Sequence, residues 1–395
     1  MNSSERYVSR ICNRSFLSLW CYPNPRRKDG KELCDILVVS DPDIIIISVK
    51  EIGFKETENN SVAHERWRKK AITKSVGQIF GAEKWIENAQ QIITKDGSYA
   101  LPFPPPERRV IHRIAVAFGG CGKTSIEYGD FGHGFVHVFD EESLNILMSE
   151  LDTISDFIQY LRDKETLISS VNKIVLEGGE EDLLTYYLAN NRSFPQAYDC
   201  IIITNDMWKV FSRSEKYQNK KRDERISYAW DALIEQLISY YHTGELLTEP
   251  SLNNFELSIR VLSKESRFGR RVLSEVFANF LQISANGEIC RVFSAHSGVT
   301  YVFLATADGI SRENRQAELH MRCILARGLR KDSEIVVGIA TECYRENAEV
   351  SYDLLYYHLE KWDEKAQETF DMIQNETGYF KNPLISGKRF DEYSV

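Results

Sequence analysis

The feature that most constrains the fold of this chain is a pair of apolar segments joined by a short polar turn. Residues 33–39 and 44–49 are rich in β-branched and aliphatic side chains, and residues 40–43 between them have the composition of a turn. This pattern predicts an antiparallel β-hairpin. In a hairpin with a symmetric turn, facing residues have numbers that sum to 83, so Asp35 should lie opposite Ser48 with Cβ atoms about 5 Å apart.

Polar side chains interrupt this apolar hairpin at one end. Lys50 lies two residues beyond Ser48, and because side chains alternate faces along a strand, both should share the face of Asp35. A buried charge is costly unless it is paired or used. The arrangement therefore indicates either a site for a metal or an anionic substrate, or a buried ion pair between Asp35 and Lys50.

The hairpin resembles the active-site motif of the PD-(D/E)XK, or restriction-endonuclease-like, superfamily of nucleases. In that family an aspartate on one strand and an acid-x-lysine sequence on the next build a metal site. Here Asp35 and Lys50 match, and Ser48 replaces the second acid. The resemblance covers roughly residues 1–120. It implies an α/β fold with a restriction-endonuclease-like N-terminal core, a mixed sheet flanked by helices, and catalysis that depends on Mg²⁺ or Mn²⁺.

The resemblance also implies roles for individual residues. Asp35 would bind the metal, Lys50 would orient the attacking water and stabilise developing charge, and Ser48 would hydrogen-bond a water on the metal. Some members with Ser-x-Lys take the missing glutamate from the following helix, where Glu65 opens the helical segment expected over residues 61–93. The helix dipole alone also favours an acid near a helix N-terminus.

Two further side chains belong to the candidate site. Glu32 is a second candidate metal ligand, whereas Glu51 should face away from Lys50 by strand parity. Gln78 lies on the packed stripe of the long helix, where some members of the superfamily carry a glutamine that contacts the site; a buried glutamine satisfied by backbone groups is the alternative. Thirteen residues, roughly 220° around a helix, separate Gln78 from Glu65, so both can serve one site only if Glu65 precedes the first turn.

The length of 395 residues is enough for two or three domains. We expect a nuclease-like domain over residues 1–140, a mostly helical middle region over 141–286 and a small α+β domain over 287–395. The first should hold a helix over residues 3–20 and strands over 109–118 and 134–139.

The later parts of the chain alternate between helical and strand patterns. Residues 213–225 are strongly charged and are expected to be an exposed connection before the helix at 227. The other elements of the middle region and of the last domain follow from periodicity. Helices are expected at 144–170, 227–241, 267–281, 312–327 and 351–377, and strands at 289–293, 299–305 and 334–340.

The net charge of −9 is not that of a protein that coats DNA over its whole surface. Two basic clusters nevertheless flank the proposed site, where they would neutralise phosphates of a nucleic acid, or else form a solvated helix face. They consist of Arg26, Arg27 and Lys28 before the hairpin, and of Arg66, Arg68, Lys69, Lys70 and Lys74 in the long helix.

A competing motif follows the strand expected at 109–118. Residues 117–124 fit a loose phosphate-binding pattern that ends in Gly-Lys123-Thr, but the glycine-rich sequence after it is unsuited to the helix that such a loop requires. An NTP-dependent regulator that uses Lys123 is therefore the minor alternative. His133 and His137 are expected to be satisfied or exposed rather than metal ligands.

The remaining sequence features bear on setting and partners. The eight cysteines are scattered without a CxxC pair, which suits reduced thiols, and neither a long apolar run nor a cleavable leader is evident, so a soluble, cytoplasmic protein is expected. The leading hypothesis is a metal-dependent endonuclease, on double-stranded DNA rather than RNA, of the kind that the resemblance associates with bacterial antiviral defence. Self-association or a partner protein is expected through the C-terminal regions. The alternative is a non-catalytic subunit that binds nucleic acid or protein.

Overall fold

The chain forms two compact units rather than three domains. The structure is a computed structural model that describes residues 1–56, 60–122, 127–170, 173–195, 200–243, 252–346, 350–382 and 390–392. Unit 1 spans residues 1–214 and unit 2 spans residues 215–395. The expected helical middle region is divided between them, because helix α4 (Glu141–Glu150) packs on the sheet of unit 1 and helix α11 (Arg267–Ser284) packs on the sheet of unit 2.

Unit 1 is built on a mixed sheet of six strands with the order β1-β2-β3-β4-β6-β5. The strands are β1 (Cys21–Pro23), β2 (Ile36–Ser40), β3 (Asp43–Glu51), β4 (Val110–Phe118), β5 (Gly129–Asp130) and β6 (Phe135–Phe139). Strand β4 is parallel to both β3 and β6, while β1, β2 and β5 join by antiparallel pairing. The predictions of strands near residues 109–118 and 134–139 are confirmed.

The hairpin of β2 and β3 has the predicted register. Ile36 faces Ile47 and Ser40 faces Asp43, so facing numbers sum to 83 along the whole ladder. The ladder ends at Ile36, and Asp35 is the residue immediately before it. Both strands are buried along nearly their full length, which explains their β-branched composition.

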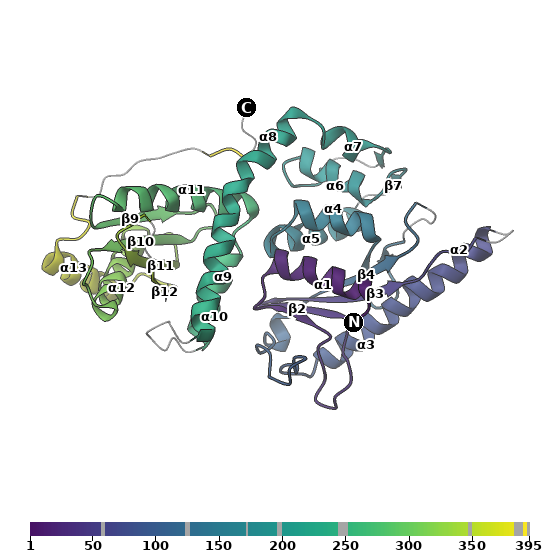
Figure 1. The fold of residues 1–395 in the computed structure, drawn as a ribbon, viewed down its shortest axis with the longest axis horizontal. Coiled ribbons are helices and arrows are strands. Elements are labelled where there is room, and N and C mark those ends of the chain that lie inside the picture. Colours follow the sequence, from purple (N-terminus) through teal and green to yellow (C-terminus); the bar gives the residue numbers. More distant parts are fainter. Residues whose placement is uncertain are drawn as a thin grey trace. The chain divides into compact units, whose positions relative to one another are not determined.

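Helices cover both faces of this sheet (Figure 1). Helix α1 (Ser3–Phe16), capped by Asn2, contacts β3 on one face. It ends at Phe16 rather than near residue 20, because Leu17 adopts a positive φ of 67°. On the other face, the segment expected as one helix over 61–93 is instead α2 (Asn60–Arg68), a π-helical turn (Lys69–Thr73) and α3 (Lys74–Ile86).

The remainder of unit 1 contains elements that the sequence patterns did not reveal. Asp140 caps α4 through a capping box with Ser143, and α5 (Ile154–Ser170) follows. The chain then forms a small parallel sheet of two strands that was not predicted. Its elements are β7 (Lys173–Leu176), α6 (Glu180–Ala189), β8 (Cys200–Ile203) and α7 (Met207–Phe211).

His137 of β6 is fully buried, with Nε2 2.9 Å from Glu165 Oε1, and no described residue supplies a hydrogen-bond partner for Nδ1. Burial lowers the pKa of His137 to about 4, although Glu165 acts in the opposite direction. The unfolded chain takes up this proton near pH 6.5, so the folded state loses stability as the pH falls from there toward 4. We expect His137→Gln to remove about 2 kcal/mol of the stability difference between about pH 7.5 and about pH 5, measured by urea unfolding. An unchanged difference in the variant would contradict this assignment.

Unit 2 is built on a four-stranded sheet with the order β12-β11-β10-β9, in which only β10 and β11 are parallel. Its strands are β9 (Ile289–Ser294), β10 (Thr300–Thr306), β11 (Ile335–Glu342) and β12 (Tyr352–His358). Its helices besides α11 are α8 (Glu215–Asp223), α9 (Tyr228–Thr243), α10 (Leu252–Ser263), α12 (Arg312–Leu329) and α13 (Glu364–Thr377), with a 3₁₀ turn at Glu224–Ser227.

Two predictions in unit 2 are wrong. The charged residues 213–225 are mostly helix α8, with Tyr217 and Lys220 buried, because Lys220 pairs with the equally buried Glu224 at 2.6 Å. The helix expected over 351–377 is preceded by β12, whose residues pair with β11 along its whole length. No helix in the described part of the chain combines the length and apolar character that a membrane span needs.

Candidate functional site

Asp35 is the residue immediately before β2, and its carboxylate lies on the face of the sheet that α3 covers. Its side chain is nearly buried, and Oδ2 accepts a hydrogen bond of 2.6 Å from the backbone N–H of Val49. The backbone carbonyl of Asp35 accepts a bond from the N–H of Asn24, which holds the residue at the end of the ladder. The carboxylate is thus fixed near the C-terminal end of β3, one residue before Lys50.

Lys50 extends from β3 toward the same carboxylate. Its Nζ atom lies 3.6 Å from Asp35 Oδ2, and 28% of its side chain remains exposed, against 5% for Asp35. The two groups therefore share one face of the sheet, as predicted, and the Lys50 side chain is partly exposed. An ion pair with one exposed member can exchange its partner for a substrate oxygen at modest cost, unlike a pair sealed in a core.

Ser48 and Gln78 form the second contact of the site. The Ser48 hydroxyl, which is fully buried, donates to the Gln78 amide oxygen at 3.1 Å. Gln78 comes from α3, so this bond ties the covering helix to the strand that carries Lys50. The alternative of a glutamine satisfied by backbone groups is not what the structure contains.

Glu65 and Glu32 do not join this group. Glu65 lies inside α2, which begins at Asn60, and its largely exposed carboxylate lies 3.6 Å from Arg68. Glu32 is exposed, and its backbone pairs with that of Arg26 in an isolated β-bridge. No three His, Cys, Asp or Glu side chains in the described ranges are placed so as to hold a metal ion. The expected acidic set of Asp35, Glu65 and Glu32 is therefore not assembled.

Glu51 is placed as its position in the strand predicts. Its carboxylate accepts hydrogen bonds from the Ser4 hydroxyl at 2.6 Å and the Ser3 hydroxyl at 3.2 Å, both in α1. Because α1 lies on the face opposite α3, Glu51 points away from Lys50. It provides an acid next to the site in sequence but outside it in space.

The basic residues are arranged mainly along the long helix. Among the described residues, no acidic partner is placed beside Arg66, Lys69, Lys70 or Lys74, all of which are exposed. Arg68 differs, since its Nε donates to Glu127 at 2.7 Å. Of the cluster before the hairpin, Arg26 and Lys28 are exposed and Arg27 is half-buried. These four cations lie in and beside the π-helical turn that leads into α3: Lys69 and Lys70 are in the turn, Arg66 precedes it and Lys74 follows it. Such turns are frequent at functional sites.

Two features near the site were not singled out from the sequence. Asn24, bonded through its backbone to Asp35, has a buried side-chain oxygen for which the described residues supply no hydrogen-bond partner. Trp67 donates from Nε1 to the Ile52 carbonyl at 2.8 Å and so fixes the start of the long helix against the end of β3. An asparagine within a Pro-Asn-Pro turn carries no sequence signal for such a position.

The donor set decides which metal ion the site fits. Asp35 and Gln78 offer a carboxylate and an amide oxygen, which are hard ligands of the kind that Mg²⁺ and Mn²⁺ prefer. Mg²⁺ usually keeps several waters and is held by one or two carboxylates together with substrate phosphates. The residues present therefore fit an ion whose shell is completed by substrate and water, and they do not fit a preformed cage of three acids.

The competing phosphate-binding motif lies in part outside the described residues, which include neither Lys123 nor Thr124. The eight cysteines are all free thiols. Comparisons of the chain with protein-family models, with curated proteins and with solved structures found no match.

Proposed function

We propose that this protein is a metal-dependent nuclease whose active site is built from Asp35, Ser48, Lys50 and Gln78. One observation carries the proposal: the carboxylate of the buried Asp35 and the ammonium of the partly exposed Lys50 side chain lie 3.6 Å apart on one face of the sheet. The mixed sheet with helices on both faces agrees with a restriction-endonuclease-like fold, which we include in the proposal.

Each residue has a task that its contacts suit. Asp35, held by the Val49 N–H, would be the carboxylate ligand of Mg²⁺ or Mn²⁺, and Gln78 would add a neutral oxygen. When bound, such an ion supplies Lewis-acid activation of the phosphodiester and of water. Lys50 would contact a phosphate oxygen and stabilise the charge that develops there. Ser48 would hold Gln78 in position through its hydroxyl.

The choice of DNA as substrate rests on the unpaired cations of the long helix. Arg66, Lys69, Lys70 and Lys74 extend along the same helix that carries Gln78, so they would lead a phosphate backbone toward the site. This local positive charge is compatible with an acidic chain, since screening limits the reach of the distant acids to about 10 Å.

A non-catalytic nucleic-acid-binding protein is the second candidate, and one observation favours it. The described residues place a single carboxylate at the site, whereas the resembled family uses two acids. In that case the same cations would bind nucleic acid without hydrolysis.

Plasmid cleavage separates the two candidates. We expect the purified chain to convert supercoiled plasmid into nicked or linear DNA with Mg²⁺ or Mn²⁺, and to stop when EDTA removes the ion. Duplex binding, measured in parallel by fluorescence anisotropy in EDTA, should persist in both cases because the cations do not depend on the metal. Binding without any cleavage in either metal would refute the nuclease and support the non-catalytic protein.

A further inference from the structure

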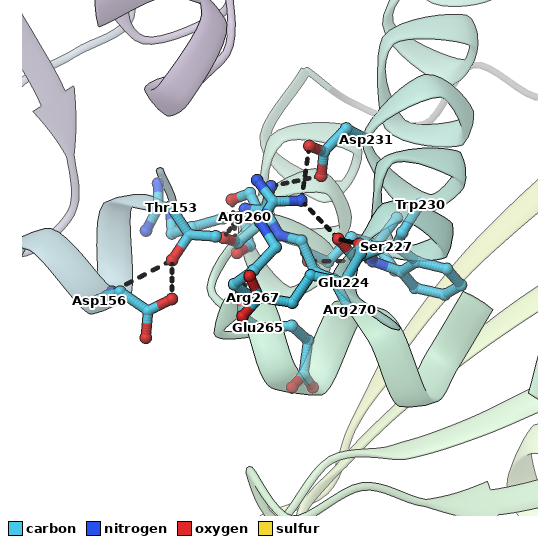
Figure 2. Close-up of polar contacts among 12 residues, drawn as sticks. Thr153, Asp156, Glu224, Ser227, Trp230, Asp231, Arg260, Glu265, Arg267 and Arg270 are labelled. Carbon is cyan, nitrogen blue, oxygen red and sulfur yellow. Dashed lines mark hydrogen bonds and ion pairs between the residues drawn. The ribbon is translucent and has the colours of Figure 1, made fainter. Parts of the chain in front are cut away.

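Helix α11 of unit 2 carries three buried arginines, and one of them is satisfied differently from the others. Arg267 and Arg270 both donate to the carboxylate of Asp231 in α9, and Arg267 also donates to Ser227 (Figure 2). These two cations share the carboxylate of Asp231 within the unit. Arg271, the next residue, has no carboxylate beside it in the described part of the chain.

Arg271 is satisfied by the C-terminal segment instead. One guanidinium nitrogen donates to the Glu392 carbonyl at 3.2 Å and another donates to the Asp391 carbonyl. Its Nε atom is buried with no hydrogen-bond partner in the described chain, and its remaining contact is the ring of Phe268, 4.9 Å from the guanidinium carbon. The two terminal nitrogens of Arg271 thus bind backbone carbonyls of this segment.

A second buried cation binds the same segment from another helix. Lys220 of α8 lies 3.7 Å from the Glu392 carboxylate while it pairs with Glu224. The segment therefore bridges α8 and α11, with one cation on its backbone and one on its acidic side chain. The charges are complementary, since the segment contains two acids, Asp391 and Glu392, and the two side chains that bind it are the cations Lys220 and Arg271.

We propose that α8 and α11 form a binding site for an acidic peptide and that the chain's own residues 390–392 occupy it in cis. Two nearly buried cations from separate helices converge on Asp391 and Glu392, which is the arrangement of a peptide receptor rather than of a surface ion pair. The segment holds α8, the first helix of unit 2, against α11. A peptide of the same chemistry from a partner would compete with it and free α8.

Peptide binding to the full chain tests the proposal. The probe is a fluorescein-labelled peptide of residues 390–395, which contains the two acids and no basic residue, and the variant Glu392→Lys unseats the internal segment by repulsion from Lys220. We expect the probe to bind Glu392→Lys at least tenfold more tightly than the wild type, whose site is filled. Adding Arg271→Gln to Glu392→Lys should abolish that gain. Equal binding to wild type and Glu392→Lys would overturn the proposal.

Hydrogen exchange provides the second measurement and its control. Exchange of the α8 amides should be at least fivefold faster in Glu392→Lys and in Arg271→Gln than in the wild type. Arg222→Gln removes a cation from the exposed side of α8 and should leave both exchange and probe binding unchanged. Unchanged exchange in the first two variants, or a dimer in sedimentation that Arg271→Gln dissociates, would overturn docking in cis. None of these readouts depends on nuclease activity.

Discussion

Replacing Asp35 by Asn should abolish metal-dependent cleavage of plasmid DNA, with a loss of about 1,000-fold or more in rate. The amide oxygen can still accept the hydrogen bond from Val49 N–H, so the hairpin should keep its geometry while the only carboxylate placed at the site in the described chain loses its charge. Loss of a preorganised charged group at the reacting centre typically slows catalysis by factors of 10² to 10³, and loss of the ion adds to this. Single-turnover cleavage with saturating protein measures the effect.

Two further variants make this result specific. Lys50→Ala should reduce the rate by about 100-fold, because it removes charge stabilisation without removing the metal ligand. Glu51→Gln changes the neighbouring acid on the opposite face, bonded to Ser3 and Ser4, and should retain activity within about twofold. If Asp35→Asn cleaves as well as Glu51→Gln does, the site assignment is wrong.

The largest expected effect on stability lies at the buried pair of Lys164 and Glu180 in unit 1. Lys164 Nζ lies 2.5 Å from Glu180 Oε2, the Tyr160 hydroxyl donates to Oε1 at 2.7 Å, and neither charged side chain is more than 5% exposed. Burial lowers the pKa of Lys164 although Glu180 opposes that shift. Glu180→Gln leaves the ammonium without a countercharge, so we expect the free energy of unfolding in urea to fall by about 3–5 kcal/mol.

A double variant distinguishes the loss of a partner from the loss of a favourable pair. Replacing a buried ion pair by apolar side chains of similar volume is often neutral or stabilising. Lys164→Met combined with Glu180→Gln removes both charges and keeps a side-chain oxygen that can accept from the Tyr160 hydroxyl, so it should recover most of the loss, to within about 1 kcal/mol of the wild type. A double variant less stable than Glu180→Gln would indicate that the pair itself, and not the uncompensated charge, stabilises unit 1.

The centre of unit 1 could be predicted because several local rules agreed there. The turn at residues 40–43 and the apolar runs on both sides set the register, and the register set the shared face of Asp35 and Lys50. The conflict between Glu65 and Gln78 was also visible from helical geometry. The first residue of the helix resolved this conflict. Because α2 begins at Asn60, Glu65 lies within the helix and is exposed, whereas Gln78 contacts Ser48 at the site.

The misses have identifiable physical causes. Helix α8 is so rich in charge that its buried positions do not show as apolar periodicity, since one of them is Lys220 neutralised by Glu224. Strand β12 has apolar and aromatic residues in an order that suits either a helix or a strand. Its pairing with β11 determines that it is a strand. The role of Asn24 depends on a backbone contact with Asp35 across eleven positions of the chain, which local patterns do not encode.

The proposed nuclease requires that Asp35 bind a divalent ion beside Lys50. Crystals of the protein soaked in Mn²⁺ and measured at the manganese absorption edge would locate such an ion. We expect an anomalous peak within metal–oxygen bonding distance of the Asp35 carboxylate in the wild type and no such peak in Asp35→Asn. A wild-type crystal with no peak at Asp35, or with manganese bound only elsewhere, would contradict it.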